Sequence, residues 1–423
     1  GQNDGKPSLR RAWNGLGPDT RRKPPFGLRP KNRIAPFFSR RQRRHNRIDA
    51  GVKGCQANPP LKTSPFPRLS PRADKKNNNK DSEQNQIDPA VDTAHPQKMI
   101  LTASLATALT LSWKHFGKAP PVSGHAVAEH QGCAWCFGGL LPSGRVTNAV
   151  WKFDGARWCL PSTNNGPSHR MYASLAACGD DALMVSGGWD PGSIGSGGTF
   201  YSDLWILNTT TLLWKKCVSR LPDGPVSRHS STQMPDSNCV LVHTFRCNNS
   251  VIVFDPHEDR LTRQETTGSW PRGISMQAGQ LMDGKLFLFG GSDRHKKMTS
   301  DTYELDLKTW IWTRHESTST SRASATIVSF DNETCVAFGG ATLNGAEYSA
   351  SALSPARDTL LANIRRSPLK WTVMRSESQP APRVAASFVK LDAGVFLFGG
   401  WSPLTYETFD DMWKLTPHDA AFD

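Results

Sequence analysis

The sequence lacks any apolar stretch of the roughly 18 residues needed to cross a bilayer. Its most apolar stretch, residues 99–113, is short and contains threonine and serine. Tyrosine is scarce, with five residues in 423, and the nine cysteines show no disulfide framework. Cys133 and Cys136 form a C-x-x-C pair, but it has neither a second pair with metal-like spacing nor a nearby histidine pair. We therefore expect no membrane span, no metal and no cofactor, and a reducing compartment, either the cytoplasm or the nucleus.

Acidic residues are few in the first part of the chain. Residues 1–98 hold 22 Lys and Arg against 8 Asp and Glu, which accounts for the whole formal charge of +14. Their high polarity and scattered prolines predict a disordered basic tail. Residues 21–47 carry eleven basic residues and no acid, so nucleic-acid binding is possible through them alone, and a nuclear import signal or an organelle transit leader is a further interpretation.

Two other interpretations of the tail are open. It is a solvated segment without a specific role, or it is a fragment or a mistaken extension upstream of Met99, since the chain starts with glycine. If translation began at Met99, the apolar stretch that follows would also resemble the core of a signal peptide.

A repeat fills the remainder of the chain. Short apolar runs end in pairs of small residues, and the second member of each pair recurs every 47 to 60 residues. The pairs are Gly138 and Gly139, Gly187 and Gly188, Gly290 and Gly291, Gly339 and Gly340, and Gly399 and Gly400. The third unit has His243 and Thr244 instead.

Each pair is followed by a polar loop, a second strand and usually a tryptophan. The second strands are residues 149–154, 202–208, 249–255, 300–306 and 409–415; in the fifth unit this strand is blurred, and residues 348–354 stand in its place. The tryptophans are Trp158, Trp214, Trp312 and Trp371, with Leu261 in the third unit. One tryptophan per unit is suited to packing one sheet on the next.

The double glycine, the second strand and the tryptophan resemble the kelch-repeat family, over residues ~108–416. The resemblance implies an all-β propeller with one four-stranded sheet per repeat. The last unit lacks its tryptophan strand, and residues 107–113, ending at Trp113, resemble that strand. We therefore predict a six-bladed kelch β-propeller over residues 99–423, closed by an N-terminal strand.

Arginines recur just before the first strand of five units: Arg170, Arg228, Arg272, Arg322 and Arg383. Repeat symmetry would place them around one mouth of the channel, where they could bind acidic peptide segments, as similar kelch domains do. The alternative is that they bond backbone carbonyls between blades. Three loop aromatics, Trp189, Trp401 and Tyr406, are candidate anchors for a partner.

These patterns favour a protein-interaction scaffold, a monomeric propeller that binds other proteins and has no catalytic residue. The alternative is an enzyme with a site in the channel, similar to sugar epimerases and mutarotases or to oxidases. His125, His229 and Glu347 are candidate acid–base residues for that alternative, although nothing in the sequence places them together.

Overall fold

The computed structural model describes residues 111–417 except 193–196, 294, 296, 316–319 and 344–352. The predicted basic tail, residues 1–98, and its boundary with the propeller lie outside the described residues. The described residues form strands and turns, and within them there is no helix that could cross a membrane.

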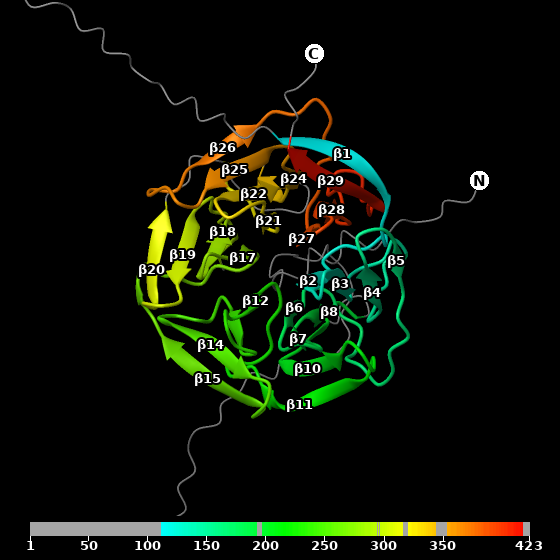
Figure 1. Ribbon diagram of the computed structural model, residues 1–423, viewed down its shortest axis with the longest axis vertical. Helices are drawn as coiled ribbons and strands as arrows, with labels where there is room; N and C mark the ends of the chain where they lie inside the picture. The colour runs from blue at the N-terminus through cyan, green and yellow to red at the C-terminus, as the bar shows by residue number, and fades with distance from the viewer. Residues whose placement is uncertain are drawn as a thin grey trace, which may run out of the picture. The chain divides into compact units, whose positions relative to one another are not determined.

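Six four-stranded antiparallel blades stand in a ring around a channel (Figure 1). The innermost strands, each of which contacts the innermost strands of both adjacent blades, are β2 (Ala126–His130), β6 (Ser174–Ala177), β12 (Ser230–Gln233), β17 (Ala278–Met282), β21 (Thr326–Ser329) and β27 (Ser387–Leu391). The second strands are β3 (Cys133–Phe137), β7 (Ala182–Ser186), β13 (Val240–His243), β18 (Lys285–Phe289), β22 (Thr334–Phe338) and β28 (Gly394–Phe398).

The third strands of the blades are those that the sequence analysis called the second strands of the repeat. They are β4 (Val150–Phe153), β10 (Asp203–Asn208), β14 (Ser250–Asp255), β19 (Thr302–Asp306), β25 (Thr359–Asn363) and β29 (Asp411–Pro417). The outer strands of blades 1 to 5 are β5 (Trp158–Cys159), β11 (Trp214–Arg220), β15 (Arg260–Glu265), β20 (Ile311–His315) and β26 (Trp371–Met374). A short strand, β16 (Thr267–Gly268), adds to the fourth blade, and the hairpins β8–β9 (Trp189–Asp190, Thr199–Phe200) and β23–β24 (Ala341–Leu343, Leu353–Pro355) lie in loops.

The predicted closure of the ring is confirmed. The outer strand of blade 6 is β1 (Leu111–Lys118), which pairs antiparallel with β29 and places Trp113 opposite Leu415. Trp113 is 3% exposed, its indole N–H donates to Thr359 Oγ1 at 3.0 Å, and its ring stacks on Phe388. The first strand of the propeller thus joins the last blade, as Figure 1 shows, and ties the two ends of the ring together.

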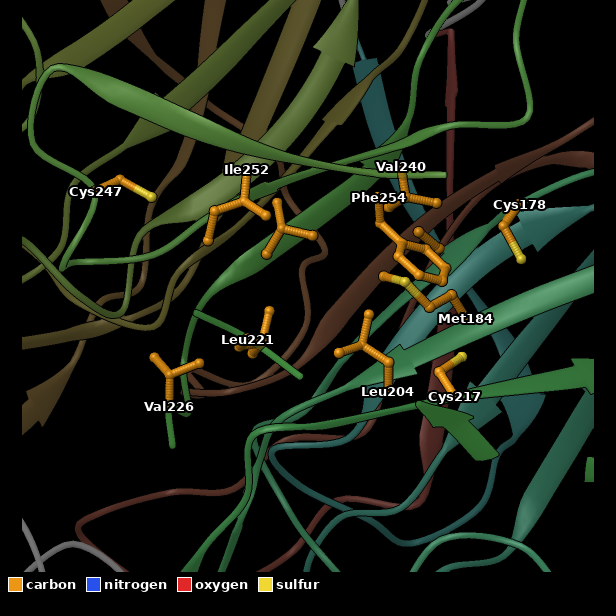
Figure 2. Packing of buried hydrophobic residues seen from close by; sticks show 12 residues of the cluster. Cys178, Met184, Leu204, Cys217, Leu221, Val226, Val240, Cys247, Ile252 and Phe254 are labelled. Atoms are coloured by element: carbon orange, nitrogen blue, oxygen red, sulfur yellow. The ribbon is translucent and has the colours of Figure 1, made fainter. Parts of the chain in front are cut away.

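Each join between adjacent blades has its own apolar cluster, and Figure 2 shows the one between blades 2 and 3. At five joins, the repeat tryptophan of one blade packs on the aromatic ring that ends the second strand of the preceding blade. These pairs are Trp113–Phe338, Trp158–Phe398, Trp214–Phe137, Trp312–His243 and Trp371–Phe289, with ring centroids 4.7–5.7 Å apart. The tryptophan repeat is therefore confirmed as a device for packing blade on blade.

The glycine pairs allow adjacent blades to approach closely. Gly138 has a φ of 70°, and a Cβ there would lie 2.5 Å from the carbonyl oxygen of Arg170 in the next blade. Gly139 donates its N–H to that same oxygen at 2.8 Å. Four other glycine pairs make the equivalent bond to the next blade, so the pair is required by both backbone angle and space.

The sequence interpretation of the fifth unit is wrong. Its third strand is β25, which begins after Asp358, whereas residues 353–355 form β24 of a loop hairpin. The connection in this blade runs over residues 339–358, longer than in the other blades, so the strand lies later in the chain than the motif spacing predicted.

Candidate functional site

Six equivalent residues form a closed ring at one mouth of the channel, where the innermost strands begin. All six have left-handed backbone angles, with φ of 53–61°, and each donates its backbone N–H to the carbonyl of the preceding member. The ring positions are Gly124, Tyr172, Arg228, Met276, Ser324 and Ala385. Because the backbone N–H and C=O groups of the ring bond one another, a ligand at this mouth can distinguish the six positions only by their side chains.

A small cavity of about 140 Å³ lies within this ring. The ring positions line it together with the residues that follow them, among which His125, His229 and Gln277 are polar. A second cavity, of about 430 Å³, occupies the other end of the channel and is lined by Glu129, His130 and Lys390 among others.

The arginines predicted to line the mouth do not share one position. Arg170, Arg322 and Arg383 lie two residues before the ring, so they are equivalent to Val122, Val226 and Ile274 in the other blades. Their side chains are at most 1% exposed. The prediction that these three contact a ligand is wrong, because their guanidinium groups are buried and bonded to groups of their own blades.

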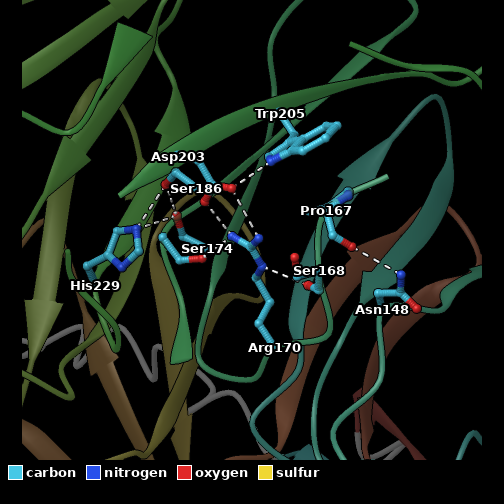
Figure 3. A network of polar contacts seen from close by, with 10 residues as sticks. Asn148, Pro167, Ser168, Arg170, Ser174, Ser186, Asp203, Trp205 and His229 are labelled. Atoms are coloured by element: carbon cyan, nitrogen blue, oxygen red, sulfur yellow. Dashed lines mark hydrogen bonds and ion pairs between the residues drawn. The ribbon is translucent and has the colours of Figure 1, made fainter. Parts of the chain in front are cut away.

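Each of the three buried arginines pairs with an aspartate at the start of its own blade's third strand. Arg170 donates to Asp203 Oδ1 at 2.6 Å (Figure 3) and to Gly187 O at 2.9 Å. Its guanidinium also lies 3.8 Å from the centroid of the Tyr201 ring. The equivalent carboxylate partners are Asp358 for Arg322 and Asp411 for Arg383. The alternative, that these arginines bond backbone carbonyls between blades, is confirmed only in part. Each guanidinium donates to a glycine carbonyl, but the glycine belongs to the arginine's own blade and not to an adjacent one.

The arginines lower the pKa of two of these aspartates. Burial raises the pKa of Asp203, but the guanidinium of Arg170 outweighs it and holds the pKa below its usual value. The pKa of Asp411 is lowered in the same way by Arg383. Asp203 and Asp411 therefore remain ionised at neutral pH, and each accepts hydrogen bonds from its arginine.

Arg228 is the one predicted arginine at a ring position. Its guanidinium lies 4.0 Å from the centroid of the Tyr172 ring and 5.4 Å from that of Trp189, and Nη1 donates to Ser227 Oγ at 3.2 Å. Arg228 is half-buried and lines the small cavity. Arg272 lies further out, is exposed, and rests on the ring of Trp270.

The predicted loop anchors are largely buried. Trp189 and Trp401 are each 2% exposed and belong to an apolar cluster beneath the loops, so the prediction that they contact a partner is wrong. Tyr406 is half-buried and stacks on Trp401. The exposed apolar side chains of these loops are Phe200, which stacks on Trp189, and Leu404, neither of which the sequence analysis singled out.

Two histidines, His125 and His229, line the small cavity from different blades. His229 Nε2 is 2.9 Å from both Ser174 Oγ and Ser186 Oγ, which are 2.8 Å from each other (Figure 3). If Nε2 accepts from one serine while the other serine donates to the first, both hydroxyl hydrogens are used, and the buried Nδ1 of His229 then carries the proton. Burial lowers the pKa of His229 to about 3 and that of His125 to about 4, so both are neutral at pH 7.

The structure thus brings together two of the three residues considered for an acid–base site, His125 and His229, whereas Glu347 lies outside the described residues. Among the described residues, no group of three or more His, Cys, Asp and Glu side chains could hold a metal ion. The described cysteines are all free.

Residues 242–422 match the model of the KLHDC2/KLHL20/DRC7 Kelch-repeats domain. The chain contains a kelch-repeat β-propeller. A solved structure, that of YjhT, aligns with 71% of this chain and 99% of its own, with a TM-score of 0.57 and 18% identity, and shows the same fold.

Curated relatives match parts of the kelch propeller. Acyl-CoA-binding domain-containing protein 5 of Arabidopsis thaliana is 26% identical over 37% of this chain and 25% of its own length. Kelch domain-containing protein 1 of Homo sapiens is 28% identical over 34% of this chain and 32% of its own. Multiple epidermal growth factor-like domains protein 8 of Mus musculus is 27% identical over 43% of this chain and 7% of its own. The chain thus spans a third or less of the length of these relatives.

Proposed function

We propose that this kelch propeller binds a partner protein through the face that carries the channel mouth, and that Arg228 receives an acidic segment of that partner. Kelch propellers are in general protein-interaction scaffolds. Arg228 supplies the cation among the six ring positions, and the ring of Tyr172 holds its planar guanidinium. An arginine fixed in this way loses little freedom when it pairs with a carboxylate through two hydrogen bonds.

The size of the small cavity supports a single side chain as the ligand. Pockets for substrate-sized molecules usually measure about 300–1,000 Å³, whereas this cavity measures about 140 Å³. Exposed Phe200 and Leu404 on the surrounding loops offer apolar contacts to the rest of the partner.

Affinity capture with the full chain tests the proposal. Wild type, Arg228→Ala and Arg145→Ala would be immobilised, and bound proteins compared by quantitative mass spectrometry. Arg145 is an exposed arginine in the connection of blade 1 and serves as the control. Alanine is accommodated at position 228 because Ala385 occupies the equivalent ring position.

We expect a protein that wild type and Arg145→Ala retain and Arg228→Ala loses. Replacing the acidic residues of its binding segment by Asn and Gln should cause the same loss. If Arg228→Ala retains every partner of the wild type at equal abundance, the proposal is wrong.

An enzyme with its site in the channel is the second candidate, favoured by the neutral imidazoles of His125 and His229 at one cavity. Mutarotase and oxidase assays with simple sugars would test it. An enzyme would be supported if the wild type turns over a sugar and His229→Asn loses that turnover while its thermal midpoint stays unchanged. If the wild type shows no turnover, binding remains as the proposed function.

A further inference from the structure

Blade 3 is built differently from its neighbours on the channel-mouth face. Its second and third strands are joined by residues 244–249 only. The equivalent connections run over 138–149, 187–202, 290–301, 339–358 and 399–410, twice as long or more. Within the described residues, the longer connections of blades 2 and 5 form the hairpins β8–β9 and β23–β24, for which the blade 3 connection has no room.

The short connection exposes an arginine that the structure holds in place. Arg246 Nη1 donates to the carbonyl oxygens of Asp223 at 3.1 Å and Pro225 at 2.5 Å. Its guanidinium also lies 4.7 Å from the centroid of the Phe245 ring, yet the residue is exposed. Its own blade has no long connection on this face that could cover it.

Arg272, at the other side of blade 3, is fixed in a similar way. It follows the outer strand of this blade, is exposed, and lies 4.5 Å from the centroid of the Trp270 ring. Both arginines are linked to the segment that carries Arg228. Arg246 donates to the carbonyl of Pro225, three residues before Arg228. Arg272 lies four residues before Met276, whose N–H donates to Arg228 O.

The surrounding charges leave this part of the face positive. Arg263 is paired with Asp223, and Asn249 donates to Glu265 Oε2. At the channel-mouth end of blade 3, four arginines, Arg228, Arg246, Arg263 and Arg272, therefore stand with these two carboxylates. Arginines that rest on aromatic rings keep their orientation and pair readily with carboxylates.

We propose that the acidic segment of the partner runs outward from Arg228 across blade 3, with further carboxylates bound by Arg246 and Arg272. This inference rests on the proposed function and specifies the ligand: an extended peptide with several spaced acidic side chains, not one isolated carboxylate. The segment lies over blade 3 because the connection between its second and third strands is the shortest of the six.

Fluorescence anisotropy with a synthetic probe tests this path. The probe is a fluorescein-labelled peptide of alternating Glu and Gly residues, and its Gln counterpart is the matched control. Full-length wild type, Arg228→Ala, Arg246→Ala and Arg272→Ala would be titrated beside Arg145→Ala and Arg375→Ala, which remove exposed arginines on other blades. Any binding by the basic residues 1–98 is common to all these variants, so differences among them report on the propeller.

We expect the Glu probe to bind more tightly than the Gln probe. Arg246→Ala and Arg272→Ala should each raise the Kd of the Glu probe about tenfold or more, as expected for loss of a charged hydrogen bond. Arg145→Ala and Arg375→Ala should leave the Kd unchanged. A photo-crosslinker at one end of the probe should label residues 244–249.

The outcomes separate the two proposals. If Arg228→Ala weakens binding but Arg246→Ala and Arg272→Ala do not, the path across blade 3 is wrong and the proposed function stands. If Arg145→Ala and Arg375→Ala weaken binding equally, or if crosslinks fall on the loops of blades 5 and 6, the path is wrong as well. If the Glu and Gln probes bind equally in every variant, both proposals fail.

Discussion

Replacing Arg170 by alanine tests whether the buried arginines stabilise the blades that contain them. The substitution removes the paired bonds to Asp203 and the bond to Gly187 O, and leaves a carboxylate whose side chain is 13% exposed without its cation. Removing one partner of a buried ion pair costs about 3–5 kcal/mol. That loss is a large part of the about 5–15 kcal/mol that stabilises a typical domain.

Thermal unfolding followed by near-ultraviolet circular dichroism measures the effect. At about 2 °C per kcal/mol for a domain of this size, the midpoint of Arg170→Ala should fall by roughly 6–10 °C. Arg272→Ala, which removes an exposed arginine, should change the stability by about 0.5 kcal/mol or less.

A double-mutant cycle sharpens the test. Arg170→Ala combined with Asp203→Asn should cost no more than Arg170→Ala alone, because a neutral amide no longer leaves an unpaired charge in the interior. The reasoning is refuted if Arg170→Ala unfolds within about 1 °C of wild type, or if it keeps its stability and loses partner binding instead.

Three further changes have expected outcomes. Trp113→Ala should lower the stability by about 3–5 kcal/mol and speed amide exchange in β29, because it removes the ring that seals blade 6; unchanged exchange would contradict closure by this strand. Burial lowers the pKa of His229 from 6.5 to about 3, so the folded state binds fewer protons and loses stability as pH falls below 6.5. At pH 5 the loss of stability is about 2 kcal/mol, at 1.4 kcal/mol per pKa unit. The urea midpoint should therefore differ less between pH 7 and pH 5 in His229→Asn than in wild type. The same difference in both proteins would contradict this role of His229. Gly138→Ala should destabilise more than Gly132→Ala, since both have φ near 70° but only the first Cβ would meet a backbone oxygen; equal urea midpoints would show that close approach is irrelevant.

The sequence predicted the fold well because the features that build it repeat. The glycine pairs, the tryptophans and the strand containing Trp113 recur at one period, so their positions in a blade could be inferred from each other. The third strand of blade 5 was misplaced because its connection is the longest, and spacing fails where loop length varies.

The candidate site was predicted less well, for a geometrical reason. Arg170 and Arg228 lie at nearly the same distance from their blades' first strands, yet the two-residue difference between them separates a buried position from the channel mouth. A partial signal was present: Asp203, Asp358 and Asp411 lie at or just before the start of the third strand in the blades whose arginine is buried. Asp301 has the same place in blade 4, which has no such arginine, so the aspartate alone does not identify these blades. The burial of Trp189 and Trp401 depends on packing between loops of different blades, which has no period in the sequence.

The dissociation constant of a captured partner for the Arg228→Ala chain tests the account most directly. Loss of a charged hydrogen-bonded contact should raise the Kd about tenfold or more, while the thermal midpoint stays close to that of wild type because alanine already occupies the equivalent position at residue 385. An unchanged Kd with an intact fold would contradict the claim that the channel mouth is where this propeller binds.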